Sequence, residues 1–150
     1  MEHMTQTAQN VQQVTQTAQL TQLKTTETLN LLDSLELTIL EKSFSVCKIK
    51  DTSDVNFMHP FVFLSKTDEE ISLVCESEHV PSNVIVAEPD WRAFRIAGTL
   101  DFSLVGVVAS ITSVLAKASI SVFVISTYNT DYVFLKSYDF ERAVSLIRNV

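Results

Sequence analysis

The search for a binding site begins with glycine, because the 150-residue chain contains only Gly98 and Gly106. Gly98 directly follows a predicted strand, residues 91–97, and Gly106 falls near the start of the helix predicted to follow it, residues 102–118. Glycine is favoured where φ is positive or where another group approaches the backbone closely. The first N–H groups of the helix have no partner within the helix and would suit a carboxylate. The glycines therefore indicate either a ligand-binding loop or a tight packing of strand against helix without a ligand.

Asp131 is the second candidate, because it opens a predicted strand, residues 131–136, directly after a tight turn. Two explanations are open. The carboxylate could cap the turn, or it could face the glycine-containing loop across the end of the sheet and bind an ammonium or guanidinium group. In the second case Thr127 would add a hydroxyl and Tyr128 an aromatic wall. Asp101 is predicted to cap the helix that follows it.

The cysteines and histidines offer weaker chemistry. Cys47, His59, Cys75 and His79 could in principle hold zinc, but their spacing does not match the paired pattern of zinc sites. The sequence shows no serine–histidine–aspartate order, no paired carboxylates in a glycine-lined cleft and no phosphate-binding loop. We therefore expect no enzyme, no cofactor and no metal site. We interpret the two cysteines as buried thiols.

Composition limits the class of protein further. Apolar residues make up 46% of the chain and charged residues 19%, so a core can form and full disorder is excluded. Eleven basic and eighteen acidic residues give a net charge of −7, which argues against a nucleic-acid partner. No apolar run reaches the roughly 20 residues of a membrane helix, and no secretory segment opens the chain. We expect a cytoplasmic protein that does not bind a membrane.

Residues 1–34 differ from the rest of the chain. Threonine and glutamine dominate, and the sequence Thr-Gln-Thr-Ala-Gln at 5–9 recurs at 15–19. Weak helical spacing of apolar residues allows two interpretations. The segment is either a polar extension, flexible or partly helical, or an amphipathic helix that packs on a partner through leucines between Leu29 and Leu35. Polar composition does not decide between them.

From residue 35 the pattern changes to that of strands. Alternating or continuous apolar residues predict four strands, and the third and fourth form a hairpin. These strands lie at residues 35–40, 44–49, 61–64 and 71–75. Pro81 and Pro89 are interpreted as part of a connection that follows them.

The last sixty residues give the clearest pattern. A strand at 91–97 is followed by a helix, two strands joined by a tight turn, and a second helix with an apolar face from Phe140 to Ile147. This order lacks one strand of a ferredoxin-like unit. The spare strand at 35–40 is the candidate to supply it, which would connect the two halves of the chain.

Three stretches of this C-terminal part resemble the ACT domain. They are Gly98-Thr-Leu-Asp-Phe-Ser-Leu-Val-Gly-Val107, Leu115-Ala116 with Ile120-Ser-Val122, and Ile125-Ser-Thr-Tyr-Asn-Thr-Asp-Tyr132. In these motifs the chain is similar to small tandem-ACT proteins related to the CASTOR-type arginine sensors. The strands between Leu35 and Cys75 look like the first half of that family. Leu104 stands where the arginine sensors carry an acid, so a different charge preference for the ligand is expected.

The resemblance implies an α+β fold of two ferredoxin-like (βαββαβ) ACT domains in tandem, with antiparallel sheets and strand exchange between the halves. The expected division is a polar extension at 1–34, an N-terminal ACT-like domain at 35–90 and a C-terminal ACT domain at 91–150.

The resemblance also implies a homodimer that binds an amino acid where two subunits meet. Ser121 and Val122 of one subunit would face the 101–107 loop of the other and its turn beside Asp131. The acid that matches Asp131 would hold the basic end of the ligand. The implied ligand-binding residues are Asp101, Phe102, Leu104, Gly106, Val107, Ser121, Val122, Thr127, Tyr128 and Asp131.

Two functions from different classes follow. The preferred one is a regulatory protein that senses a free amino acid and changes its contacts with a protein effector. The alternative is a ligand-free structural or adaptor protein, which recruits a partner through an exposed sheet edge and the Thr/Gln-rich extension. The two differ in whether the glycine-containing loop and Asp131 line a closed polar site or lie flat on the surface.

Overall fold

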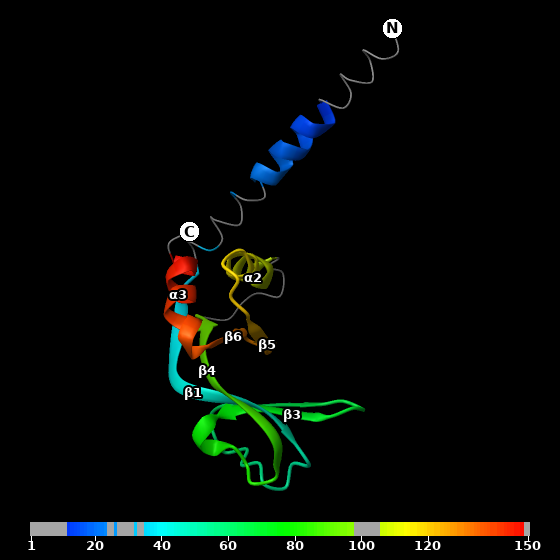
Figure 1. The fold of residues 1–150 in the computed structure, drawn as a ribbon, viewed down its shortest axis with the longest axis vertical. Coiled ribbons are helices and arrows are strands. Elements are labelled where there is room, and N and C mark those ends of the chain that lie inside the picture. Colours follow the sequence, from blue (N-terminus) through cyan, green and yellow to red (C-terminus); the bar gives the residue numbers. More distant parts are fainter. Residues whose placement is uncertain (1–11, 24–25, 27–31, 33–34, 98–105, 149–150) are drawn as a thin grey trace.

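Six antiparallel strands form one sheet in the order β2-β3-β1-β4-β6-β5 (Figure 1). The computed structural model describes residues 12–23, 26, 32, 35–97 and 106–148. The strands are β1 (Leu37–Ile49), β2 (Val62–Lys66), β3 (Ile71–Glu76), β4 (Val84–Ile96), β5 (Phe123–Ser126) and β6 (Asp131–Lys136). The helices that accompany them are the 3-10 helix η1 (Ser77–His79), α2 (Val107–Lys117) and α3 (Ser137–Arg148). The α+β class and the antiparallel sheet are confirmed.

The two longest strands, β1 and β4, pair with each other along most of their 13 residues. The beginning of β1 pairs with the end of β4, from Leu37 opposite Ile96 to Leu40 opposite Ala93. As a result β1, β4, β6 and β5 follow the strand order of a ferredoxin-like unit, with residues 37–40 as its fourth strand. The prediction that the spare strand completes the C-terminal half is confirmed.

The other group of strands, β4, β1, β3 and β2, has the same order but lacks the two helices of such a unit. Residues 50–61 form turns, and only the three-residue η1 follows β3. Asp51 and Asn56 accept hydrogen bonds from the backbone N–H groups of Ser53 and Met58, each at 3.0 Å. These side chains compete with helical hydrogen bonds. The expectation of two helices in each half is therefore wrong for the N-terminal half.

Bulges explain two further differences from the predicted strands. The two strands predicted between residues 35 and 49 are one strand, β1, whose register against β4 shifts between Leu40 and Phe44. Pro89 lies inside β4 rather than in a connection, because Pro89 and Asp90 together stand opposite one residue of β1. Asp90 has a φ of 65° at this point. A bulge accommodates a proline, which cannot donate a hydrogen bond to the neighbouring strand.

Helices α2 and α3 cover one face of the C-terminal part of the sheet. Between the helices and the sheet lies the helix-side cluster, whose buried members include Ile96, Ile111, Val133, Leu135 and Phe140. Apolar residues at helical spacing on both helices supply this packing, as the sequence predicts. Within the described residues, no helix has the length and apolar character that crossing a membrane would require.

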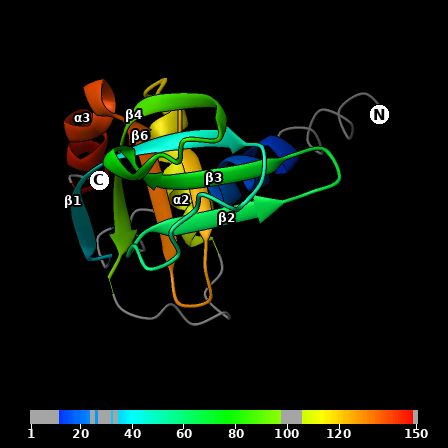
Figure 2. The same cartoon turned by 90° about the horizontal axis from the view of Figure 1, so that it is seen from below.

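The opposite face carries a second cluster, because the sheet bends and β2 and β3 pass across β6 (Figure 2). We call it the aromatic cluster and define it as Phe44, Phe61, Phe63, Phe123 and Phe134. The ring centroid of Phe63 on β2 lies 5.8 Å from that of Phe134 on β6. The aromatic cluster therefore holds the N-terminal strands against the C-terminal half.

Cys47 and Cys75 are free and buried, as predicted. They belong to one small apolar cluster on neighbouring strands, together with Ile49 and Leu73. The hydrogen bond with Cys47, followed by burial, raises the pKa of the Cys75 thiol. This thiol therefore stays protonated at neutral pH and packs as a small apolar side chain.

The N-terminal extension contains a helix over residues 12–23, and its side chains are exposed, including Val14, Leu20 and Leu23. Leu32 is buried in the helix-side cluster, and Leu35 packs against it. Leu29 and Leu31, which were also expected on an apolar face, lie outside the described residues. Leu32 and Leu35 are therefore part of the core and not a surface for a partner.

Candidate functional site

Gly106 directly precedes α2 and has φ of 90° and ψ of 2°. This is a left-handed conformation, which side chains with a Cβ rarely adopt. A Cβ at this position would meet no described atom within 4 Å, so tight packing does not explain this glycine. Because a left-handed residue cannot belong to a right-handed helix, α2 begins at Val107 and not at residue 102 as predicted.

The N-terminus of α2 has no side-chain cap among the described residues, and its first turn contains no acidic residue. The first hydrogen bond within the helix runs from the Ser110 N–H to the Gly106 carbonyl, at 2.8 Å. The N–H groups from Val107 to Ala109 therefore have no partner inside the helix. Together with the helix dipole, they would stabilise a carboxylate.

Two threonines close the turn between β5 and β6. The N–H and Oγ1 of Thr127 both donate to the carbonyl of Thr130, at 2.9 and 2.7 Å. The buried Oγ1 of Thr130 in turn donates to the carbonyl of Ile96, at 2.9 Å. This bond connects the turn to the end of β4. This role of Thr130 was not predicted, because nothing in the local sequence shows that its hydroxyl reaches a strand 34 positions earlier.

Replacing Thr130 by valine should lower the free energy of unfolding by about 1 kcal/mol, because the buried Ile96 carbonyl loses its donor while the side-chain volume is kept. Urea denaturation measures the change. The control is Thr112→Val, since the hydroxyl of Thr112 donates to carbonyls of its own helix, at Val108 and Ala109. Equal stability of the two variants would contradict the prediction.

Asp131 is the first residue of β6 and stands opposite Ser126. Its side chain is half-buried and makes no hydrogen bond or ion pair with any described residue. Thr127 closes the turn, so the explanation that Asp131 caps it is not supported. Val133 and Leu135 lie in the helix-side cluster. Strand alternation therefore places Asp131 on the same face of the sheet as α2.

One chain brings only part of the predicted site together. Gly106 and Val107 precede and open α2, and Thr127 and Tyr128 lie in the turn, which the Thr130 hydroxyl connects to Ile96 at the end of β4. Tyr128 is 80% exposed and Val107 is buried. The remaining predicted residues near the loop, Asp101, Phe102 and Leu104, lie outside the described residues, as does Gly98.

Ser121 and Val122 are not part of this group. They precede β5, whereas the turn with Thr127 follows it. Five residues of extended chain separate Val122 from Thr127 by roughly 17 Å. Ser121 is exposed, and Val122 packs against the helix-side cluster. Within one chain, these two residues cannot contact the same small molecule as Asp131.

Replacing Gly106 by alanine should lower the free energy of unfolding by about 1 kcal/mol, because alanine must adopt φ near 90°. Thermal or urea denaturation gives the value. The matched variant is Gly106→Asn, which should cost less, since asparagine tolerates the left-handed region. If alanine costs no more than asparagine, the backbone conformation is not what selects glycine.

A separate cleft of about 290 Å³ lies where β1, β4 and α3 meet. Glu41, Lys42, Ser43, Arg92 and Ser137 line it. Nη1 of Arg92 is 2.7 Å from Oε1 of Glu141, and its guanidinium rests over the ring of Phe140. Lys42 is engaged with Glu76. Both cationic side chains of the cleft are therefore already paired with carboxylates, and we assign the cleft no ligand.

The four residues considered for zinc are not brought together as a group. The rings of His59 and His79 stack with their centroids 3.6 Å apart, but Cys47 and Cys75 lie in a buried apolar cluster. Among the described residues, the group of potential metal ligands is Glu76, Glu78 and His79. The two glutamates were not among the predicted ligands, which were cysteines and histidines.

Comparison with known proteins supports the family resemblance for the C-terminal half. Residues 86–149 match the family model of the ACT domain. A comparison with curated protein sequences gave no match.

Solved structures share the fold over most of the chain. Protein Atu0741 from Agrobacterium tumefaciens is 29% identical with a TM-score of 0.68, over 77% of this chain and 87% of that one. Protein VC0802 from Vibrio cholerae, described as of unknown function, is 17% identical with a TM-score of 0.64, over 83% and 97%. The ligand-free regulatory subunit of aspartate kinase from Thermus thermophilus is 10% identical with a TM-score of 0.54, over 75% and 95%.

The family match covers most of β4 together with α2, β5, β6 and α3. These are the elements that give the C-terminal half its strand order and its helix packing. ACT domains are regulatory ligand-binding domains. The match to the ACT-domain family model is confined to residues 86–149 of this chain.

Proposed function

We propose that this chain is a cytoplasmic regulatory protein that binds a free amino acid between the ACT domains of two copies. Two features carry the proposal, because they offer opposite partners to a zwitterion: a helix start without a side-chain cap and a carboxylate without a partner among the described residues. The uncapped start of α2 would take the carboxylate. Asp131, which has no partner among the described residues, would take the ammonium group or a basic side chain.

The proposed dimer completes this site. Ser121 and Val122 lie too far from Asp131 to act in the same chain, so in the proposal they come from the second copy. The division into an extension at 1–34, an ACT-like domain at 35–90 and an ACT domain at 91–150 belongs to the proposal, as does the tandem arrangement. The shared strand orders of the two halves support it. The relation to the arginine sensors remains a prediction.

A ligand that prefers one arrangement of the two copies would shift the population of that arrangement and so alter contacts with a protein effector. Sedimentation of the full chain with and without ligand tests the dimer. Calorimetry with each standard amino acid at millimolar concentration tests binding. A dimer without heat from any of them would leave the ligand-free adaptor as the better function, and a monomer would remove the shared site.

Replacing Asp131 by asparagine should weaken binding of the amino acid found in this way by about tenfold or more, because a hydrogen bond to a charged group contributes about 1.5–3 kcal/mol. Isothermal titration calorimetry measures the affinity. The control is Asp68→Asn, an exposed acid in the turn between β2 and β3. Unchanged affinity in the Asp131 variant would exclude the proposed role of this carboxylate.

A further inference from the structure

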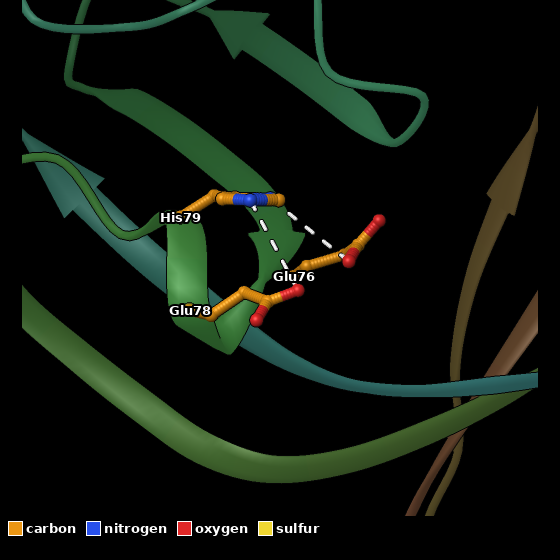
Figure 3. Close-up of side chains that lie close together, drawn as sticks. All are labelled: Glu76, Glu78 and His79. Atoms are coloured by element: carbon orange, nitrogen blue, oxygen red, sulfur yellow. Dashed lines mark ion pairs between the residues drawn. The ribbon is translucent and has the colours of Figure 1, made fainter.

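A second group of polar side chains lies far along the chain from the proposed amino-acid site. Glu76 ends β3, and Glu78 and His79 belong to η1, so the three come from one short segment (Figure 3). One ligand atom from each residue lies within 4.8 Å of the others. Figure 3 shows the imidazole of His79 directed toward both carboxylates, with ion pairs drawn to each.

The charge and burial of this group are unusual for a surface segment. The side chain of Glu76 is only 3% exposed. Its Oε2 lies 2.7 Å from Nζ of Lys42, which is its one full counter-charge among the described residues, and Lys42 also reaches Glu78 at 3.4 Å. Two carboxylates against one ammonium group leave a net charge of −1 beside a buried oxygen. A further positive charge would therefore be favourable here.

Two buried atoms, one nitrogen and one oxygen, face each other in this group. Nδ1 of His79 is buried and has no hydrogen-bond partner among the described residues. It lies 3.9 Å from Oε2 of Glu76, too far for a hydrogen bond. A zinc ion forms bonds of about 2.1 Å to nitrogen and oxygen, so one ion can reach both atoms across this gap.

The side chains of this group differ in their freedom to move: His79 is held in place, whereas Glu78 and Lys42 can adjust. His59 stacks on His79 with an interplanar angle of 11°, which fixes the imidazole plane. Glu78 is 65% exposed, and Oε1 lies 4.0 Å from Nε2 of His79, so its side chain can turn inward. Lys42 is 46% exposed and can withdraw its ammonium group into water.

From this geometry we infer that Glu76, Glu78 and His79 form a binding site for a divalent transition-metal ion such as Zn²⁺. Two carboxylate oxygens and one imidazole nitrogen are ligands that zinc accepts in proteins, with water completing the coordination. The ion would replace Lys42 as the counter-charge of Glu76. It would fix η1 to the end of β3, in the half of the chain that lacks long helices.

The test is calorimetric titration of the chelator-treated full chain with Zn²⁺, together with the Zn²⁺-dependent rise in melting temperature. We expect one ion per chain. His79→Gln and Glu78→Gln should each weaken binding by more than about tenfold, since even loss of a group that only supports a ligand costs about 10–100-fold. Lys42→Met should strengthen binding, because the competing ammonium group is gone. Glu69→Gln, in the turn between β2 and β3, is the control and should bind as the unmodified chain does.

Cobalt(II) in place of zinc identifies the ligand atoms. Oxygen and nitrogen ligands should give d–d absorption without the intense sulfur-to-cobalt charge-transfer band of a thiolate site. Three outcomes would each overturn the inference. The full chain does not bind the ion, the His79 and Glu78 variants bind it as tightly as the unmodified chain does, or the spectrum shows a thiolate band from Cys47 or Cys75. None of these outcomes depends on whether an amino acid binds near Asp131.

Discussion

Replacing Phe134 by alanine should lower the free energy of unfolding by about 3–5 kcal/mol, the largest effect that we expect from a single substitution. Phe134 is completely buried. Its ring packs edge-on against Phe44 at 5.3 Å and Phe63 at 5.8 Å, and lies 6.0 Å from Phe123, between ring centroids. Alanine would leave a cavity and remove all three contacts. Urea denaturation followed by tryptophan fluorescence reports the loss, since Trp91 packs against this cluster.

The matched control is Phe57→Ala, because Phe57 is 58% exposed in the turns between β1 and β2. That change should cost less than about 0.5 kcal/mol. A small effect at Phe134 would mean that the N-terminal strands do not depend on β6 for their packing. The bent arrangement of the sheet would then need a different explanation.

Replacing Glu76 by glutamine should lower the free energy of unfolding by about 1–3 kcal/mol at neutral pH. The substitution removes the buried carboxylate and with it the ion pair to Lys42. The effect should depend on pH. Lys42 lowers the pKa of Glu76 below its ordinary value of 4.5. A carboxyl group with a lowered pKa in the folded state stabilises the fold above its unfolded pKa, and this contribution is lost as the pH falls through the folded pKa.

The difference in stability between the unmodified chain and Glu76→Gln should therefore be constant above about pH 5 and shrink in more acidic solution. Urea denaturation over a series of pH values, with a chelator present throughout, measures this difference. Glu69→Gln is the control, because its carboxylate is exposed. A difference that stays the same from neutral to strongly acidic pH would show that the ion pair with Lys42 does not cause it.

The spacing of apolar residues predicted the C-terminal half well. Its strands and helices are short, and each packs its apolar side chains into the same sheet or against it. The strand predicted at 131–136 coincides with β6, and the apolar face from Phe140 to Ile147 lies on α3. The predicted start of α2 was wrong, because the spacing of apolar residues does not reveal the left-handed conformation of Gly106. Prolines misled the interpretation of β4, since a bulge around Pro89 and Asp90 permits a strand where the sequence indicates a connection.

The candidate site was predictable only in part. Gly106 and Asp131 stand out by type and position, and the structure shows a left-handed Gly106 before α2 and Asp131 at the start of β6. Thr130 does not stand out, since its role depends on a contact with a distant strand. Glu76 also escaped notice, because a glutamate at the end of a strand is usually exposed, and here the neighbouring Phe44 and Lys42 enclose it.

The sharing of β1 and β4 between the two halves has a consequence for the order of events on the ribosome. Residues 37–40 are synthesised long before the strands beside which they finally lie, yet they cannot reach their place until the end of β4 has emerged. The N-terminal strands, in turn, wait for the beginning of β4. The C-terminal unit therefore cannot be completed without a segment of β1 that was synthesised earlier, and the N-terminal strands cannot be completed before β4 has been synthesised.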